Sequence, residues 1–387
     1  MSVDNKGKRV PLRRQLSSAR ALFFVGGFGT ASWAPLVPIL RERLAIAEDV
    51  LGMLLLCIGV GSLLTMPLSG AAAAKFGCRR TLTVSAAFFA LLLLALCQVS
   101  SLGVAAALLF VFGAAMGCID VVVNIQAVMV EKTARKRLMS NMHAMWSVGG
   151  FVGAAAFGVW VGWLGLTPAM STLIAAAVIF ALLAKFAEGL LPYGSERGGA
   201  IVAIPRGIVV FIGAVAFIAF LAEGAIMDWS GVFLRTIKGV DIASAGSGFA
   251  VFSAAMLVMR LVGDGAVNIL GQKAVVIGGS LVAFLGFWLV VFAPVMALTY
   301  AGFFLIGIGG ANVVPVFYSL MGKQKDMPLG SAVPAVSTLG YLGVLAGPAA
   351  IGFLAHQTSL YFAFVFLAVL TAVQAAIAAY VYRRVLS

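Results

Sequence analysis

The sequence predicts an all-α integral membrane protein with twelve transmembrane helices in two homologous six-helix halves. Its composition, its apolar runs and an internal repeat lead to this fold class. Hydrophobic residues make up 63% of the 387 residues and charged residues only 10%, whereas a soluble domain has about 25% charged residues. The mean hydropathy is +1.11. A chain of this composition is expected to lie in a lipid bilayer.

Twelve apolar runs, each about as long as a hydrocarbon core is thick, define the predicted spans. They cover residues 20–40, 50–74, 80–99, 102–129, 141–163, 168–191, 207–233, 243–263, 274–293, 296–320, 331–354 and 359–382. The first six form a half at 20–191 and the last six a half at 207–382. A tail at 1–19, a polar, Gly-rich linker at 192–206 and a tail at 383–387 complete the chain.

An internal repeat supports the division into halves. Residues Gly307 to Ser319 match Ala115 to Ala127 at an offset of 192, which is almost half the chain, and Asp120 aligns with Asn312. A repeat at this spacing predicts two homologous halves joined head to tail.

The distribution of basic residues predicts the orientation. If the N-terminus is cytoplasmic, 22 of the 26 Lys and Arg residues lie in inner segments and 4 in outer loops. The positive-inside rule therefore predicts that both termini are cytoplasmic. Because the basic residues are spread over every inner segment, the net charge of +13 does not indicate nucleic-acid binding.

The loop after the second span carries a recognisable signature. It consists of two glycines and three basic residues, namely Gly70, Lys75, Gly77, Arg79 and Arg80. This pattern resembles the loop between helices 2 and 3 of the major facilitator superfamily, although Ala74 stands where the family has Asp. A weaker copy in the second half comprises Arg260, Gly263, Asp264 and Gly271.

Other segments are similar to bacterial fucose-permease-like members of that superfamily. They are the pair Asp120 and Asn124, the fifth-span start NMHAMWSVGG and the seventh-span run AEGAIMDWSG. The resemblance implies a proton-linked carrier for a small solute such as a sugar, working by alternating access. It also implies a monomer in a bacterial inner membrane, with no cofactor.

The resemblance further implies an inner gate at these loops, with Lys75, Gly77, Arg79, Arg80, Arg260 and Asp264 as gate residues. Arg260 and Asp264 lie one helical turn apart at the predicted inner end of the eighth span and can pair on one face. Since Ala74 replaces the family's Asp, we expect the gate to depend more on Asp264. The alternative is that the basic residues only anchor the loops.

Two carboxylates are predicted to lie deep in the membrane. At about 1.5 Å per residue, Asp120 lies about 15 Å inside the hydrocarbon core and Glu223 about 22 Å along the seventh span. A carboxylate at this depth is costly unless it has a function or a partner. Burial favours the protonated form of a carboxyl group, so both residues are candidates for proton coupling.

The predicted depths of the charged residues also indicate the substrate class. No Lys or Arg is placed at comparable depth, so a neutral polar or a cationic substrate is favoured over an anion. Hydrogen-bonding or stacking side chains could come from Asn124, Asn312, Trp33, Trp146, Tyr341 and Asp228.

Several of the polar, aromatic and small residues also have a purely structural interpretation. Trp33 could belong to an interfacial aromatic belt, Asp228 could pair with Arg235, and His143 could be an ordinary interfacial histidine. Small-residue pairs such as Gly149 and Gly153 could serve moving faces or static packing alike.

Other functions are less compatible with the sequence. The chain has two histidines, no H-E-x-x-H, no G-x-S-x-G and no phosphate-binding loop, which argues against an enzyme. It has no selectivity-filter motif, which argues against a channel. Within transporters, the alternative to sugar-like uptake is proton-driven efflux of hydrophobic or cationic compounds.

Overall fold

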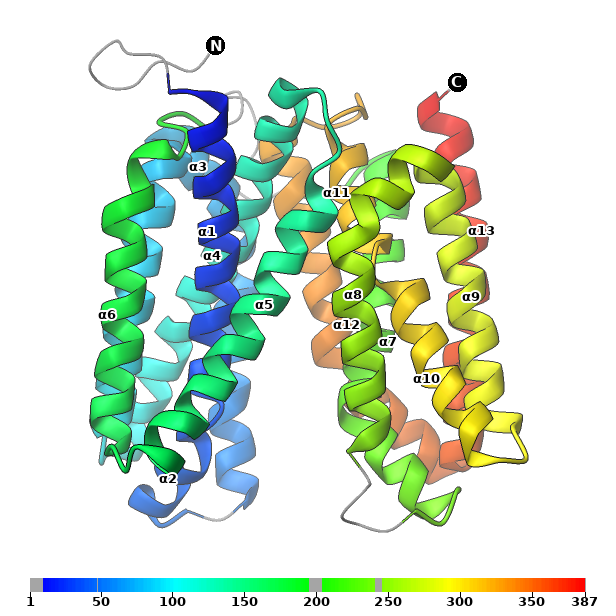
Figure 1. Ribbon diagram of the computed structural model, residues 1–387, viewed down its shortest axis with the longest axis horizontal. Helices are drawn as coiled ribbons and strands as arrows, with labels where there is room; N and C mark the ends of the chain where they lie inside the picture. The colour runs from blue at the N-terminus through cyan, green and yellow to red at the C-terminus, as the bar shows by residue number, and fades with distance from the viewer. Residues whose placement is uncertain (1–9, 47, 195–203, 241–245, 387) are drawn as a thin grey trace. The chain divides into compact units, whose positions relative to one another are not determined.

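The computed structural model describes residues 10–46, 48–194, 204–240 and 246–386. Residues 1–9 of the predicted N-terminal tail, the middle of the linker and the first residues of the predicted eighth span lie outside the described residues. The α-helices are α1 Leu12–Trp33, α2 Leu36–Leu44, α3 Glu48–Gln98, α4 Leu102–Ala134, α5 Met139–Gly158, α6 Pro168–Phe186, α7 Ile208–Thr236, α8 Ser247–Leu270, α9 Gln272–Phe292, α10 Met296–Gly310, α11 Val313–Met321, α12 Leu329–Gln357 and α13 Leu360–Leu386 (Figure 1).

The helices confirm the twelve-span fold. The second and third spans form the single element α3, which contains a non-helical residue at Gly77. The first span is divided into α1 and α2 at Ala34–Pro35, and the tenth is divided into α10 and α11 at Ala311–Asn312. Proline lacks the N–H that a continuous helix would need at Pro35, which explains the first break. A short π-helix, Val159–Trp163, follows α5, and a 3₁₀ turn, Ala187–Gly189, follows α6.

The chain forms two compact units. The first contains residues 1–136, 142–204 and 328–334, and the second contains residues 137–141, 205–327 and 335–387. In the first unit, α1 and α3 each pack against α4 and α6. In the second, α9 packs against α10 and α13, α7 against α13, and α8 against α10.

Glycines allow these helices to approach closely. Between α9 and α10, Gly286 and Gly302 face each other, and a Cβ built on either would lie 2.7 Å from the other's carbonyl oxygen. The predicted small-residue stripes form the same kind of contact, since each glycine lies on a backbone carbonyl of another helix in its own unit. These contacts are Gly113 on Ile58, Gly149 on Phe24 and Gly343 on Phe217. The stripes therefore serve packing inside each unit.

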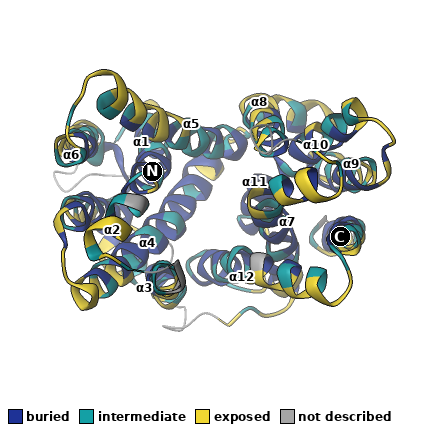
Figure 2. Ribbon diagram, turned by 90° about the horizontal axis from the view of Figure 1, so that it is seen from below, coloured by how far each residue is buried: buried dark blue, intermediate teal, exposed yellow. Residues whose placement is uncertain are grey.

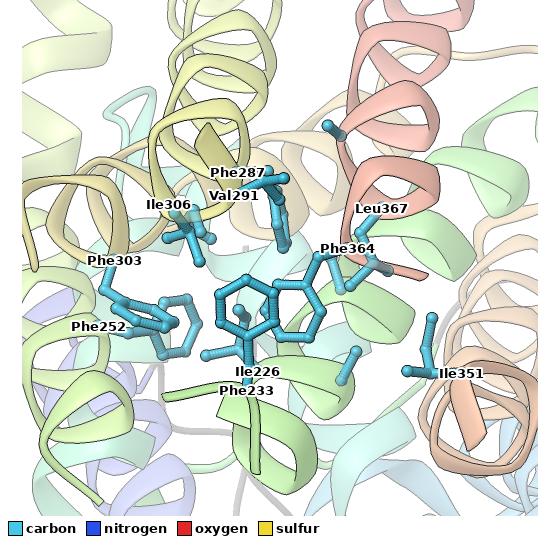
Figure 3. Close-up of a cluster of buried hydrophobic side chains, with 14 of the residues drawn as sticks. Ile226, Phe233, Phe252, Phe287, Val291, Phe303, Ile306, Ile351, Phe364 and Leu367 are labelled. Carbon is cyan, nitrogen blue, oxygen red and sulfur yellow. The ribbon is translucent and has the colours of Figure 1, made fainter. Parts of the chain in front are cut away.

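Aromatic side chains fill the interior of each unit. In the second unit, the rings of Phe233 and Phe364 stack with centroids 4.3 Å apart, among buried residues of several helices (Figure 3). In the first unit, Phe89 and Phe112 stack at 4.4 Å. Figure 2 shows that α4 is buried along much of its length, and the side chain of Asn124 on this helix is fully buried.

The predicted repeat is also visible in the backbone. Gly77 has φ 82° and ψ 155°, and Gly271, which lies 194 residues later, has φ 82° and ψ 154°. Only glycine adopts this conformation readily. The two loops therefore turn in the same way, which the sequence motif alone does not establish.

Candidate functional site

A polar chain joins α4 to α5 in the first unit. Asn124 is fully buried and donates from Nδ2 to the backbone oxygen of Asp120 at 2.8 Å and to its Oδ1 at 3.4 Å. On its other side, Asn124 Oδ1 lies 3.1 Å from Nε2 of His143. Because an amide oxygen only accepts, Nε2 must carry the hydrogen of this bond. The arrangement brings together a carboxyl group, an amide and an imidazole.

Packing holds His143 in this place. Its ring lies 5.2 Å from the ring of Phe23 on α1, and its side chain is half-buried. The sequence left open whether His143 is an ordinary interfacial histidine, and the bond to Asn124 favours the polar chain. The separation of 19 residues between the two side chains gives no sequence signal for this contact.

A second cluster joins α7, α8 and the break in the tenth span. Arg260 is buried, and its Nη2 lies 3.6 Å from Oε2 of Glu223. Its Nε donates to the backbone oxygen of Ala311 at 3.3 Å. Asn312 donates from Nδ2 to the backbone oxygen of Met259 at 3.1 Å. Arg260 thus satisfies a carbonyl that the helix break leaves open and compensates the charge of Glu223.

The position of Arg260 corrects the prediction that no base lies as deep as the carboxylates. The predicted span ended at residue 263, whereas α8 continues to Leu270. Arg260 therefore lies well inside the helix, and its ion pair is formed with Glu223. The argument against an anionic substrate consequently loses its premise, although the pair is electrically neutral as long as Glu223 is ionised.

The two predicted tryptophans are packing residues in this structure. Trp33 is 6% exposed and lies 5.8 Å from the ring of Phe112, so it is not part of a lipid-facing belt. The ring of Trp146 lies directly on Gly26 of α1, where a Cβ would come within 3.0 Å of it. Trp146 is half-buried, so one side of its ring is covered by α1.

The remaining two substrate candidates lie on α7 and α12. Asp228 is exposed on α7, and Tyr341 is half-buried on α12. Two other polar residues have structural partners. Gln126 accepts from the backbone N–H of Leu191 at 3.0 Å, and Tyr318 bonds Ser337 at 2.5 Å.

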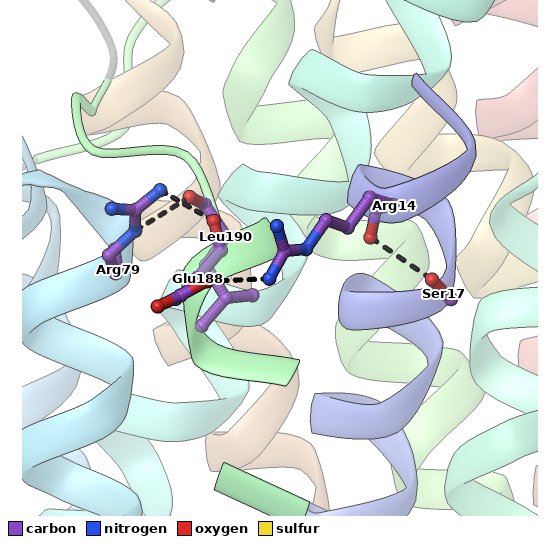
Figure 4. Close-up of polar contacts among 5 residues, drawn as sticks. All are labelled: Arg14, Ser17, Arg79, Glu188 and Leu190. Carbon is purple, nitrogen blue, oxygen red and sulfur yellow. Dashed lines mark hydrogen bonds and ion pairs between the residues drawn. The ribbon is translucent and has the colours of Figure 1, made fainter. Parts of the chain in front are cut away.

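The predicted gate loop after the second span is bound to the end of the first half. Arg79 donates from Nη2 to the backbone oxygen of Glu188 at 2.6 Å and from Nε to that of Leu190 at 3.1 Å (Figure 4). Its backbone N–H donates to the oxygen of Leu191 at 2.8 Å. A Cβ at Gly77 would collide with the carbonyl of Pro192. Both residues thus stabilise a connection inside the first unit.

The other two basic residues of that loop are exposed. The Nζ atom of Lys75 lies 5.2 Å from the ring centroid of Phe76, and Cζ of Arg80 lies 5.8 Å from it. These contacts are consistent with anchoring at a membrane surface.

Asp264 has a different environment. Its two carboxylate oxygens accept the backbone N–H groups of Ser140 and Asn141, at 3.1 and 3.0 Å. These amides belong to the first turn of α5, where the helix provides no partner for them. A carboxylate at this position also interacts favourably with the helix dipole. Asp264, which extends from α8, therefore caps α5.

Comparisons with known proteins agree with this architecture. Twelve membrane helices in two homologous halves, together with this loop signature, are the architecture of a membrane transporter. The Major Facilitator Superfamily profile matches residues 21–324. The chain belongs to the Major Facilitator Superfamily.

Its relatives are bacterial membrane proteins. The chain is 44% identical over 351 residues to an uncharacterised MFS-type transporter of Yersinia pestis, covering 90% of this chain and 91% of the relative. It is 30% identical over 363 residues to the membrane protein MosC of Rhizobium meliloti, covering 92% and 86%.

Solved structures share the fold. The fucose:proton symporter FucP of E. coli superposes with a TM-score of 0.79 at 13% identity, covering 95% of this chain and 98% of that one. The human organic anion transporter MFSD10 gives 0.77 at 18% identity, covering 96% and 100%. These similarities concern the fold, and membership of the Major Facilitator Superfamily makes the chain a multi-pass membrane transporter.

Proposed function

We propose that this transporter is proton-coupled and that Asp120 carries the coupled proton. The observation behind the proposal is that Asp120 is bonded to neutral Asn124, with no ion pair to any residue of the described chain. Such a carboxyl group can take up a proton without breaking an ion pair. His143, at the other end of this polar chain, can also bind a proton, and its hydrogen bond connects it to the amide of Asn124.

Glu223 has a different proposed role. Its ion pair with Arg260 compensates its charge, and its side chain is 37% exposed, so it is accessible to a solute or to water. Protonation of Glu223 would leave Arg260 buried without this counter-ion, which is costly. Proton uptake and solute binding at this cluster would therefore be linked.

A small neutral polar solute, sugar-like in chemistry, fits this arrangement best. The Arg260–Glu223 pair offers both donors and acceptors while it is neutral overall. An anion would have to compete with Glu223 for Arg260, and a hydrophobic cation would gain little from the buried guanidinium. We place the transporter in a bacterial inner membrane with both termini cytoplasmic, because its named relatives are bacterial and its basic residues are distributed accordingly.

Proton movement in proteoliposomes tests the proposal. A pH-sensitive dye inside the vesicles reports proton flux while sugars and, separately, lipophilic cations are added to wild type, Asp120→Asn and Glu223→Gln. Glu188→Gln is the matched control, since Glu188 is an exposed carboxylate paired with Arg14. We expect a sugar-dependent pH change that Asp120→Asn abolishes, with labelled-solute exchange retained.

The other outcomes discriminate clearly. Proton flux that persists in Asp120→Asn would refute its coupling role. A pH change driven by cations and not by sugars would instead favour efflux. Solute exchange without proton movement in the wild type would indicate a uniporter.

A further inference from the structure

The second unit contains a basic cavity whose lining includes no residue of either polar cluster. Its volume is about 470 Å³, and it lies between the start of α7, the loop joining α11 to α12 and the end of α13. Its polar lining includes Lys323, Lys325, Asp326 and Arg384. With three basic residues and one acidic residue, the lining has a net charge of +2. Nothing in the transport proposal uses this cavity.

The hydrogen bonds in the cavity determine which of its charged side chains can bind a ligand. Asp326 Oδ2 accepts the backbone N–H of Ile208 at 2.7 Å, so this carboxylate is committed to capping α7. Lys323 Nζ donates to Gln272 Oε1 at 3.1 Å, which fixes its position. Lys325 is exposed and has no hydrogen bond or ion pair to any residue in the described ranges. The cavity thus has a cation available for a ligand.

The other wall of the cavity is aromatic. The rings of Phe211 and Tyr380 lie 4.8 Å apart, and the side chains are 38% and 40% exposed. The guanidinium of Arg384 lies 5.9 Å from the Tyr380 ring. The cavity therefore has cations beside an apolar aromatic surface at the ends of two membrane helices. This combination suits a phosphate ester attached to an apolar chain.

We propose that this cavity binds a phosphate group, with an anionic phospholipid of the surrounding membrane as its source. Lys325 and Arg384 hold the phosphate oxygens, while Phe211 and Tyr380 contact the glycerol and the first part of the acyl chains. A basic pocket between helices at a membrane surface attracts anionic head groups, and each basic residue strengthens the attraction. The lipid would fill the space between α7, α13 and the loop that follows α11.

The test uses the full chain in nanodiscs of phosphatidylcholine, with and without phosphatidylglycerol. Lipid retention is measured by native mass spectrometry and thermal unfolding by its midpoint. In a parallel arm, inorganic phosphate is titrated into the phosphatidylcholine nanodiscs. The variants are Lys325→Gln and Arg384→Gln. Arg383→Gln is the matched control, because Arg383 is exposed in the same turn but does not line the cavity.

We expect phosphatidylglycerol to be retained over phosphatidylcholine and to raise the unfolding midpoint of wild type and Arg383→Gln. Each charge removed from the cavity should weaken this binding about fivefold. If inorganic phosphate gives the variant-dependent shift and phosphatidylglycerol does not, the phosphate site stands and its source is soluble. The proposal is overturned if all three variants respond alike to phosphatidylglycerol, or if neither ligand changes the wild type.

Discussion

The cap that Asp264 provides for α5 allows a quantitative prediction. Asp264→Asn removes the charge and leaves one accepting oxygen for the two amides of Ser140 and Asn141. Loss of one hydrogen bond costs about 1 kcal/mol, and loss of the charge at the helix N-terminus costs about 0.5 kcal/mol. The first turn of α5 should therefore open about 1.5 kcal/mol more easily, which corresponds to a roughly tenfold larger open population.

Hydrogen–deuterium exchange measures this opening directly. The amides of Ser140 and Asn141 should exchange about tenfold faster in Asp264→Asn than in the wild type. Asp326→Asn is the matched control, because Asp326 caps α7 through Ile208 and should change exchange only there.

Unchanged exchange at Ser140 and Asn141 would refute the capping argument. Faster exchange with normal transport and normal access of both membrane sides to the solute would retain the cap but refute its proposed role in the gate. Transport that slows in step with the exchange would support both.

Three further perturbations test the packing and the ion pair. Gly27→Ala places a methyl group on a backbone carbonyl of α5, so it should lower the unfolding free energy by about 1 to 3 kcal/mol, measured by denaturant unfolding in detergent. Arg79→Gln removes the hydrogen bonds to two backbone carbonyls and should therefore speed proteolysis after α6. Arg80→Gln, at an exposed position, should not. Glu223→Gln should destabilise the protein when Arg260 is present and much less in the Arg260→Met background, and equal effects in both backgrounds would rule out coupling.

Hydropathy and repeat spacing were sufficient to predict the membrane fold. Apolar runs of span length have few alternatives, because every backbone polar group inside a bilayer must be satisfied within a helix. The two divided spans were not predicted. Pro35 is a visible signal for the first break, and Pro315 is one for the second, because it lacks the N–H that would bond the carbonyl of Ala311 four residues earlier.

The environment of Arg260 was missed for a specific reason. Glycine and aspartate at 263 and 264 resemble a helix end, so the predicted span stopped there. In the structure, Gly263 is an interior residue on which the side chain of Asn312 lies directly. Contact between distant segments explains this glycine, and a single sequence does not contain that information.

The link between His143 and Asn124 was hidden for the same reason. Helical periodicity tells which face of α4 carries Asn124, but it does not tell which helix covers that face. The depth of Asp120 could be predicted because distance along a helix follows from counting residues, and this depth stays a prediction. Partners across helices depend on the packing of glycines and aromatic rings, which becomes visible only when the helices are assembled.

The paired glycines Gly77 and Gly271 should tolerate substitution to different degrees. Their backbones have the same shape, but Gly77 is enclosed by the carbonyl of Pro192, whereas a Cβ at Gly271 would meet nothing within 4 Å. A side chain at Gly271 should therefore cost only the strain of this backbone conformation, which is essentially restricted to glycine, whereas a side chain at Gly77 should add a collision with the carbonyl of Pro192. The first loop is thus held both by its backbone conformation and by its neighbour, and the second by its backbone conformation alone.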